Sequence, residues 1–319
     1  TQHAYGAGKV VWGEPLEKVL GVPADFTASQ GNLLFTHRKD GETDIYFVSN
    51  QGKQAVTAEC SFRVTGKVPE FWHPDTGRRE RVALYSEKDG VTKLPVALDP
   101  SGSVFVVFKK EPTPVPPLVS FEVNGRNPFA EAGKVGIPEF SKNGITFTST
   151  EPGTYQATTA SGATVKGEIP APPAPVVIEG PWEVEFPPLA PSDKEPLKTT
   201  FEKLASWSDS TVERIQHFSG TATYRKTFQV SGLRSPASRI FLELGNVKNL
   251  AEATLNGKPL GILWKEPFRV DVTDALVEGK NELVIQVTNL WVNRLIGDEK
   301  LPEKDRATWT SGHPLKATD

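Results

Sequence analysis

The sequence has little that could support covalent, metal or nucleic-acid chemistry. Cys60 is the single cysteine in 319 residues, so no internal disulfide can form and no cysteine-built metal site is expected. Lys and Arg number 36 against 39 Asp and Glu, a net charge of −3, which lacks the basic footprint of a nucleic-acid binder. No run approaches the roughly 18 apolar residues that a membrane helix needs.

Methionine is also absent, even at position 1. The chain starts at Thr1 within what reads as structured sequence, so we expect a processed product or part of a longer protein. No signal peptide is visible, but a part of a longer chain would lack one in any case. The residues alone therefore do not indicate a cellular location.

What the sequence does have is turns and short strands. Hydrophobic residues make up 37% and charged residues 24%, which is typical of a folded chain, and Gly and Pro number 27 each. At roughly 100–200 residues per domain, two or three domains are expected. Short alternating runs bounded by turn residues predict an all-β fold, and Asn256-Gly257 predicts a hairpin turn.

Composition shifts and two Pro-rich joints divide the chain into five predicted parts. Residues 1–30 are predicted to be the tail of an upstream α/β or catalytic domain, with a short helix that Glu14-Pro15 opens. Residues 31–111 are predicted to form a β-sandwich, with strands that include 82–85 and an aromatic turn at 71–77. The other parts are 112–178, Pro-rich linkers and a small β module; 179–300, a sugar-binding-like jelly roll; and 301–319, a truncated polar tail.

The titratable residues do not isolate a catalytic centre. A glycosidase needs two carboxylates facing one sugar bond. Asp298, Glu299 and Glu252 have interesting neighbours, but they are interpreted as solvated surface or ion-paired groups. The five histidines form no closely spaced pair, and the alternating acids of 40–44 are interpreted as a charged turn rather than a calcium loop. No nucleophile elbow or phosphate-binding loop is present.

Aromatic residues give the remaining signal. A Trp ring can stack on a sugar while its N–H stays in water, although most Trp residues of a sandwich fill the core, so both interpretations stay open. Planar amide and guanidinium donors beside Trp291 suit hydroxyl recognition. The candidate carbohydrate-binding residues are Trp264, Trp291, Asn293, Arg294, His217 and Trp72.

Several long segments, in order, resemble one family. FSGTATYRKTF (218–228), LNGKPLGILWKEPFRVDVT (255–273) and NLWVNRLIGDE (289–299) resemble the C-terminal sandwich of bacterial glycoside hydrolase family 106 α-L-rhamnosidases. The same domain type is similar to the galactose-binding-like, sugar-binding domain of family 2 glycosidases. DIYFVSNQ (44–51) and SFRVTGKVPEFWHPDTG (61–77) resemble the β domain that precedes it.

The resemblance implies an enzyme that removes terminal α-L-rhamnose with inversion, using two Glu side chains and calcium in a (β/α)₈ barrel. A barrel of roughly 250 residues cannot fit before Phe26, so no catalytic residue is carried over to this chain. We therefore expect no catalytic residue, metal or cofactor here. The expected partners are a rhamnose-containing glycan and the missing N-terminal barrel, and the expected location is periplasmic or secreted.

Three functional interpretations stay open at this point. The chain is the non-catalytic C-terminal region of a rhamnosidase-like enzyme, an autonomous carbohydrate-binding module, or a structural β scaffold without a ligand. Whether the chain is itself an enzyme is left undecided.

Overall fold

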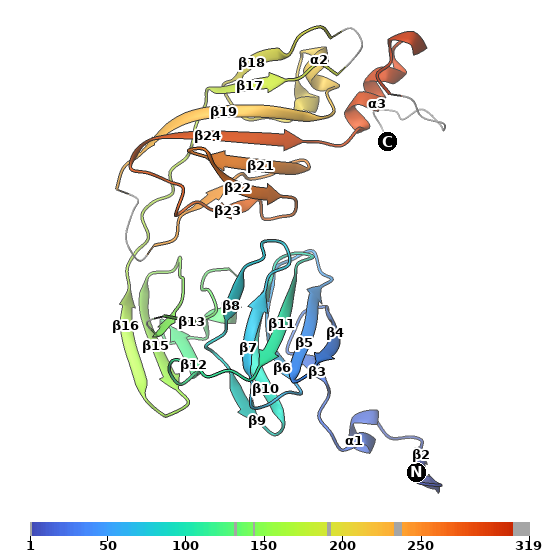
Figure 1. The fold of residues 1–319 in the computed structure, drawn as a ribbon, viewed down its shortest axis with the longest axis vertical. Coiled ribbons are helices and arrows are strands. Elements are labelled where there is room, and N and C mark those ends of the chain that lie inside the picture. Colours follow the sequence, from blue (N-terminus) through green and yellow to red (C-terminus); the bar gives the residue numbers. More distant parts are fainter. Residues whose placement is uncertain (1, 131–132, 143, 190–192, 233–237, 309–319) are drawn as a thin grey trace. The chain divides into compact units, whose positions relative to one another are not determined.

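The computed structural model describes residues 2–130, 133–142, 144–189, 193–232 and 238–308. They form two compact units, Thr1–Pro172 and Pro173–Asp319 (Figure 1). Every ladder between named strands is antiparallel, and the helices are short. The prediction of an all-β chain, with a sandwich followed by a small β module and a jelly roll, is confirmed; the exact five-part division stays a prediction.

Two sheets form the sandwich of the first unit. The four-stranded sheet has the order β3 (Phe26–Ala28), β6 (Val56–Phe62), β10 (Val91–Leu98) and β9 (Ser86–Lys88). The five-stranded sheet has the order β4 (Leu33–Asp40), β5 (Thr43–Asn50), β11 (Ser103–Lys109), β7 (Val68–Trp72) and β8 (Arg79–Arg81).

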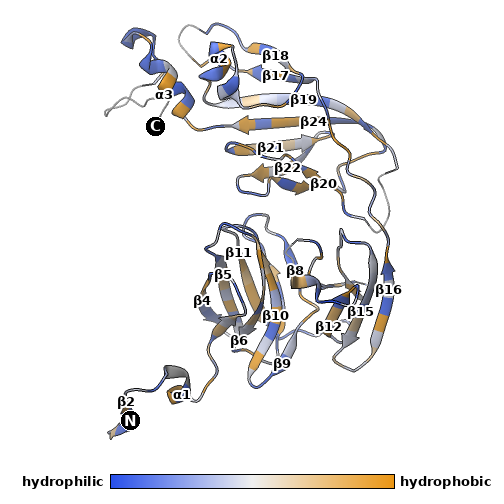
Figure 2. Ribbon diagram, turned by 180° about the vertical axis from the view of Figure 1, so that it is seen from behind, coloured by the Kyte–Doolittle hydropathy of each residue, from blue (hydrophilic) through white to orange (hydrophobic). Residues whose placement is uncertain are grey.

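The sandwich core follows the two-residue period of its strands. Tyr46 and Val48 on β5 are fully buried, and Leu94 and Val96 of β10 point to the same core. Figure 2 shows how hydrophobic and hydrophilic residues are mixed along these strands. Phe108 ends the buried run of β11, and its ring lies 5.2 Å from the ring of Phe62. Aromatic packing of this kind joins the two sheets.

The N-terminal segment precedes this sandwich. It consists of a hairpin of β1 (Gln2–Tyr5) and β2 (Gly8–Val11), followed by the helix α1 (Leu16–Leu20). The helix ends at Gly21, whose φ of 63° is left-handed and therefore favours glycine. The predicted short helix is confirmed, although it begins at Leu16, after the Glu14-Pro15 pair that was expected to open it. Large apolar side chains of this segment are exposed, namely Tyr5, Val10, Trp12, Leu20 and Val22.

Residues 82–85 do not form the predicted strand. These residues are extended and buried, but they form single bridges and isolated backbone hydrogen bonds instead of a ladder. Val82, Ala83 and Tyr85 pack in the sandwich core, whereas Leu84 packs in a second cluster with Leu118. The segment therefore links the sandwich to the small β module within one unit.

The small β module contains two sheets and a single 3₁₀ turn. Its three-stranded sheet has the order β12 (Leu118–Val123), β15 (Gly153–Thr159) and β16 (Thr164–Ile169). A short hairpin pairs β13 (Glu139–Ser141) with β14 (Gly144–Thr146), and η1 is Pro128–Ala130. One face of the larger sheet packs on a core that includes Phe121, Val123 and Ala157.

The second unit is built on one large sheet. Its order is β18 (Leu197–Phe201), β17 (Trp182–Phe186), β19 (Thr221–Val230), β24 (Gly279–Thr288), β21 (Leu250–Leu255) and β22 (Lys258–Leu263). A second sheet pairs β20 (Phe241–Glu243) with β23 (Arg269–Asp271). The hairpin between β21 and β22 turns at Asn256 and Gly257, with φ of 52° and 75°, as predicted.

Short helices complete the described part of the second unit, and the last of them lies within the predicted polar tail at 301–319. They are η2 (Trp207–Asp209), α2 (Glu213–Gln216), α3 (Val292–Glu299) and η3 (Glu303–Asp305). Residues 309–319 of the predicted tail lie outside the described residues. No helix in the described ranges is long and apolar enough to cross a membrane.

Replacing Phe108 by Ala should remove an aromatic anchor between the two sheets of the sandwich. Truncation of a fully buried Phe costs about 3–5 kcal/mol. Phe105→Ala on the same strand is the control, because Phe105 points to the other face and is half-buried. Urea unfolding followed by circular dichroism should show a clearly larger loss of stability for Phe108→Ala. Equal losses would contradict this account of the core.

Candidate functional site

Exposed apolar side chains gather at one end of the six-stranded sheet. Leu250, at the start of β21, pairs with Thr288 at the end of β24, and the next residue Ala251 pairs with Leu263 at the end of β22. Trp264 therefore follows β22 at the sheet end from which Trp291 leaves β24. Their side chains are 56% and 55% exposed. Other exposed apolar residues here are Leu250, Ile262, Leu290 and Val292.

The Asn289 side chain fixes the segment that carries Trp291. Its amide nitrogen donates to the Phe218 carbonyl at 2.9 Å, and its amide oxygen accepts from the Gly220 N–H at 2.9 Å. The Ser219 hydroxyl accepts from the Arg294 N–H at 2.9 Å. The loop at 218–220 thereby holds the start of α3, and the exposed indole projects from a fixed backbone.

Arg294 and Asp298 form a buried ion pair one turn apart on α3. Asp298 Oδ2 also accepts from the Ala307 N–H, the Thr308 N–H and the Thr308 hydroxyl at 3.0, 2.7 and 2.7 Å. Burial alone raises the pKa of the Asp298 carboxyl, but these hydrogen bonds and Arg294 outweigh it and hold the pKa below its ordinary value. The interpretation of Asp298 as solvated surface is wrong, whereas its ion pairing is confirmed.

His217 lies beneath the same helix. It follows α2 and is buried, and its Nε2 is 3.4 Å from Lys300 Nζ. A Cβ added at Gly297 would lie 2.6 Å from His217 Cβ, so only glycine permits this approach. Burial, and then Lys300, lowers the pKa of His217. Of the predicted site residues, the structure thus brings together His217, Asn293 and Arg294, where α3 packs against the residue that follows α2.

Trp72 belongs to the first unit. The Arg79 guanidinium carbon lies 4.2 Å and Lys109 Nζ 4.8 Å from its ring centroid. The indole N–H donates to Glu70 at 2.8 Å. The predicted turn at 71–77 is shorter than expected, because Phe71 and Trp72 are the last residues of β7. A sugar stacking on Trp72 would have to displace a cation, so this prediction stays without support.

A partly buried charge network lies at the edge of the same sandwich. Both ring nitrogens of His37 face carboxylates, Nδ1 at 2.9 Å from Asp25 and Nε2 at 3.0 Å from Asp44. The imidazole also stacks on Tyr46, with 3.9 Å between centroids. Lys67 binds Asp44 at 2.6 Å. The network engages Asp44, the one buried acid of the 40–44 pattern, and it gives both ring nitrogens of His37 a carboxylate partner within the fold.

Carboxyl groups with shifted pKa values do not resemble a glycosidase acid. Within the described ranges these are Asp44, Glu151 and Asp298, and all three pKa values are lowered. For Asp44, burial raises the pKa and the Lys67 and His37 contacts reverse the shift, whereas Arg126 and Asn124 lower the pKa of Glu151. A general acid at neutral pH needs a raised pKa. The described residues also contain no cluster of three metal-ligating side chains.

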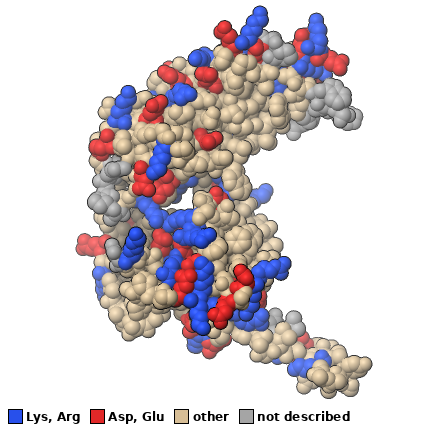
Figure 3. Space-filling view, viewed as in Figure 1, with Lys and Arg blue, Asp and Glu red and all other residues tan. Residues whose placement is uncertain are grey.

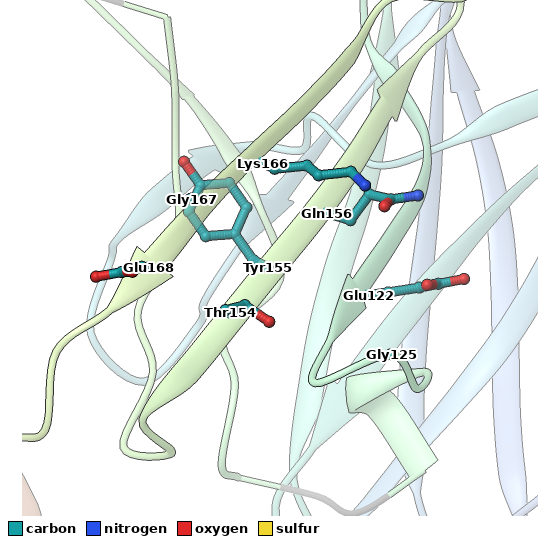
Figure 4. Close-up of a pocket in the computed structure, with 8 residues that line it drawn as sticks. All are labelled: Glu122, Gly125, Thr154, Tyr155, Gln156, Lys166, Gly167 and Glu168. Carbon is teal, nitrogen blue, oxygen red and sulfur yellow. The ribbon is translucent and has the colours of Figure 1, made fainter.

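A hollow of the first unit lies on the small β module (Figure 4). It is a depression of about 450 Å³ lined by Glu122, Gly125, Thr154, Tyr155, Gln156, Lys166, Gly167 and Glu168. None of these residues was a sequence candidate. The signal in the sequence was the alternation of polar residues in 153–169, but their cross-strand neighbours depend on the sheet register.

Fold and surfaces together define the class: an all-β protein with a β-sandwich and a galactose-binding-like jelly roll. Residues 1–87 match the family model of glycoside hydrolase family 106, described as α-L-rhamnosidase. Residues 207–316 match the glycosyl hydrolase 2 galactose-binding domain-like model. The resemblance to rhamnosidases and to family 2 sugar-binding domains is thereby confirmed.

Two known proteins are similar over most of the chain. The structure of a rhamnosidase from Novosphingobium sp. PP1Y is 29% identical with a TM-score of 0.72, and the match covers 100% of this chain and 26% of that one. A Formosa agariphila protein named as a β-glucuronidase is 27% identical over 92% of this chain and 41% of its own length. The chain therefore spans less than half of either relative.

Replacing Asp298 by Asn should destabilise the second unit, because it leaves the buried Arg294 charge without its partner. Breaking such a pair costs about 3–5 kcal/mol. The folded pKa of Asp298 is below the unfolded value of 3.8, so its stabilisation is complete above pH 3.8 and is lost as the pH falls through the folded pKa.

Thermal unfolding of both proteins between pH 7 and pH 2 measures this. The difference in melting temperature should be large at pH 7 and should shrink below pH 3.8. A difference that is independent of pH would show that the Asp298 charge is not what ties α3 to residues 307–308.

Proposed function

We propose that the chain is the non-catalytic C-terminal β region of a glycoside hydrolase of the α-L-rhamnosidase type, and that its jelly roll binds carbohydrate. The observation that carries the proposal is the likeness of the whole chain to about a quarter of a rhamnosidase structure. The two family matches at 1–87 and 207–316 support it from independent segments. A location outside the cytoplasm, where polymeric glycans are met, follows from the same proposal.

The absence of a catalytic role is supported by fold and by charge. The barrel of such an enzyme needs roughly 250 residues of alternating parallel strands and helices. The ladders of the described residues are all antiparallel. Glycoside hydrolysis also needs one carboxyl with a raised pKa beside a second carboxylate. In the described part of the chain, the carboxyl groups with a shifted pKa all have a lowered pKa instead.

Trp264 and Trp291 are the proposed sugar-binding residues. Each presents more than half of its side chain to solvent, although an indole of this size normally fills a sandwich core. An exposed indole offers a flat apolar face and an N–H donor, which suits the apolar face and the hydroxyl edge of a pyranose. Binding there would hold a polymer near the catalytic barrel of the parent enzyme and raise its effective concentration.

A second role, packing against a catalytic barrel, is favoured by the N-terminal segment. Tyr5 is 78% exposed, and Val10 and Trp12 are each 54% exposed, on a hairpin that lies outside the hydrophobic core clusters of its unit. Apolar groups exposed in this number mark interaction surfaces. In this role the segment at 2–22 contacts the barrel, while the jelly roll remains the sugar-binding part.

The purified chain should not hydrolyse an aryl α-L-rhamnoside or an aryl β-D-glucuronide. Release of the aryl group, measured by absorbance over a day at high enzyme concentration, should stay at the rate of the buffer. The two substrates correspond to the names of the two relatives. Turnover that survives repeated purification would sink the proposal that the chain is non-catalytic.

Tryptophan fluorescence should report sugar binding at the exposed end of the jelly roll. Titration with rhamnose-containing oligosaccharides should give a saturable change in emission. Trp264→Ala or Trp291→Ala should weaken the affinity at least tenfold, about 1.4 kcal/mol. Trp12→Ala is the matched control, since Trp12 is equally exposed but lies in the other unit, and it should leave the affinity unchanged. Unchanged affinity in both site variants would exclude this end as the binding site.

A further inference from the structure

One face of the three-stranded sheet of the small β module lies away from the core that the described residues of this module form. Alternation places Phe121, Ala157 and Val165 on the other face, because Phe121 and Val165 pair with Ala157 in register. On the uncovered face, Gln156 lies directly opposite Glu122 of β12 and Lys166 of β16. The three polar side chains therefore form a row across three neighbouring strands.

A second row on the same face lies beside the first. Thr154 pairs with Glu168, two residues along the strands from the Gln156–Lys166 pair. Figure 4 shows Lys166 extending toward Gln156, with Glu122 and Glu168 lying apart on the two outer strands. The depression of about 450 Å³ lies among these side chains. Its polar lining thus comes from strand register.

These side chains are free of internal partners. In the described ranges, no hydrogen bond or ion pair engages the side chains of Glu122, Gln156, Lys166 or Glu168. Cross-strand charges elsewhere in the unit do pair, as Lys109 does with Glu70 at 3.1 Å. The hollow therefore offers two carboxylate acceptors, an ammonium donor and an amide that both donates and accepts.

We propose that this depression is a second carbohydrate site, one that binds a neutral oligosaccharide through its hydroxyl groups. Each sugar hydroxyl can donate to Glu122 or Glu168 and accept from Lys166, and the Gln156 amide serves either role. The row spans two strand spacings, about 10 Å, which lets adjoining sugar rings contact it together.

The charge pattern disfavours other ligands. Two carboxylates against one ammonium repel a phosphate or an acidic peptide. Glu122 and Glu168 lie on the two outer strands with Gln156 and Thr154 between them, so they do not converge on a cation. The Tyr155 ring is the single aromatic group among the lining residues, and it also packs against the core of the module, so the hollow offers little to anchor a hydrophobic peptide.

The site goes beyond the proposed function and rests on it only for the choice of polymers as probes. Residues 118–169 lie outside both matched family segments, which end at 87 and begin at 207. A polar hollow gives weak binding by itself. Linked to the jelly-roll site on one chain, it would increase the avidity for a polymer that reaches both.

Affinity electrophoresis of the full chain tests the proposal, with a rhamnan, a galactomannan or a xyloglucan cast into native gels. The test protein is the Trp264→Ala/Trp291→Ala variant, which lacks the proposed jelly-roll site. It should still be retarded by at least one polymer. Adding Gln156→Ala and Lys166→Ala should raise the dissociation constant for that polymer, obtained from the retardation, at least tenfold. The isosteric Glu122→Gln should weaken it too without altering the shape of the sheet.

Matched controls separate this site from general surface charge. Lys198→Ala removes an exposed lysine from β18 of the other unit and should leave the retardation unchanged. Circular dichroism melting should show that every variant is folded.

Three outcomes overturn the proposal. If the two Trp substitutions abolish all retardation, the jelly-roll site stands and this one falls. If the depression variants bind as well as their parent, the hollow is not the site. If no polymer retards the unaltered chain, both sites fall.

Discussion

The period of two along antiparallel strands is the constraint on which the other features depend. Each strand must give one face to a core, and burial of Tyr46, Val48 and their partners is what holds the sandwich together. The opposite faces do not pack in a core, so their side chains determine which ligands they can contact. The row at Gln156 lies on such a face, and Trp264 directly follows β22, whose Leu260 and Leu263 pack against the second core.

Local signals in the sequence were enough for much of the fold. The turn at Asn256-Gly257 and the end of α1 at Gly21 are set by residues that tolerate left-handed backbone angles, so they can be read without tertiary knowledge. The helix at 292–299 could not be predicted from local residues alone. Asp298 holds it by binding both Arg294 and residues 307–308. The extended segment at 82–85 was misread for a related reason, since its partners at 118 and 139 are remote in the chain.

The candidate site residues also include some that the sequence could indicate and others that depend on the folded chain. For Trp264 and Trp291 the sequence leaves core packing and sugar stacking open, and their exposure in the folded chain argues against core packing, whereas sugar stacking stays a prediction. Arg294 and His217 look like ligand-binding groups in the sequence, yet packing turns both inward beneath one helix. The hollow on the small module was missed altogether. It depends on Glu122 and Lys166 flanking Gln156, and no local pattern fixes that register.

The two hydrogen bonds of the Asn289 side chain affect the entropy cost of binding any ligand at Trp291. Both ends of its amide are engaged by the loop at 218–220, so the backbone beneath the indole is already ordered. Ordering one backbone residue costs about 1–2 kcal/mol in entropy, and here that loss belongs to folding rather than to association. The indole is preorganised, and its residual freedom is that of two side-chain torsions.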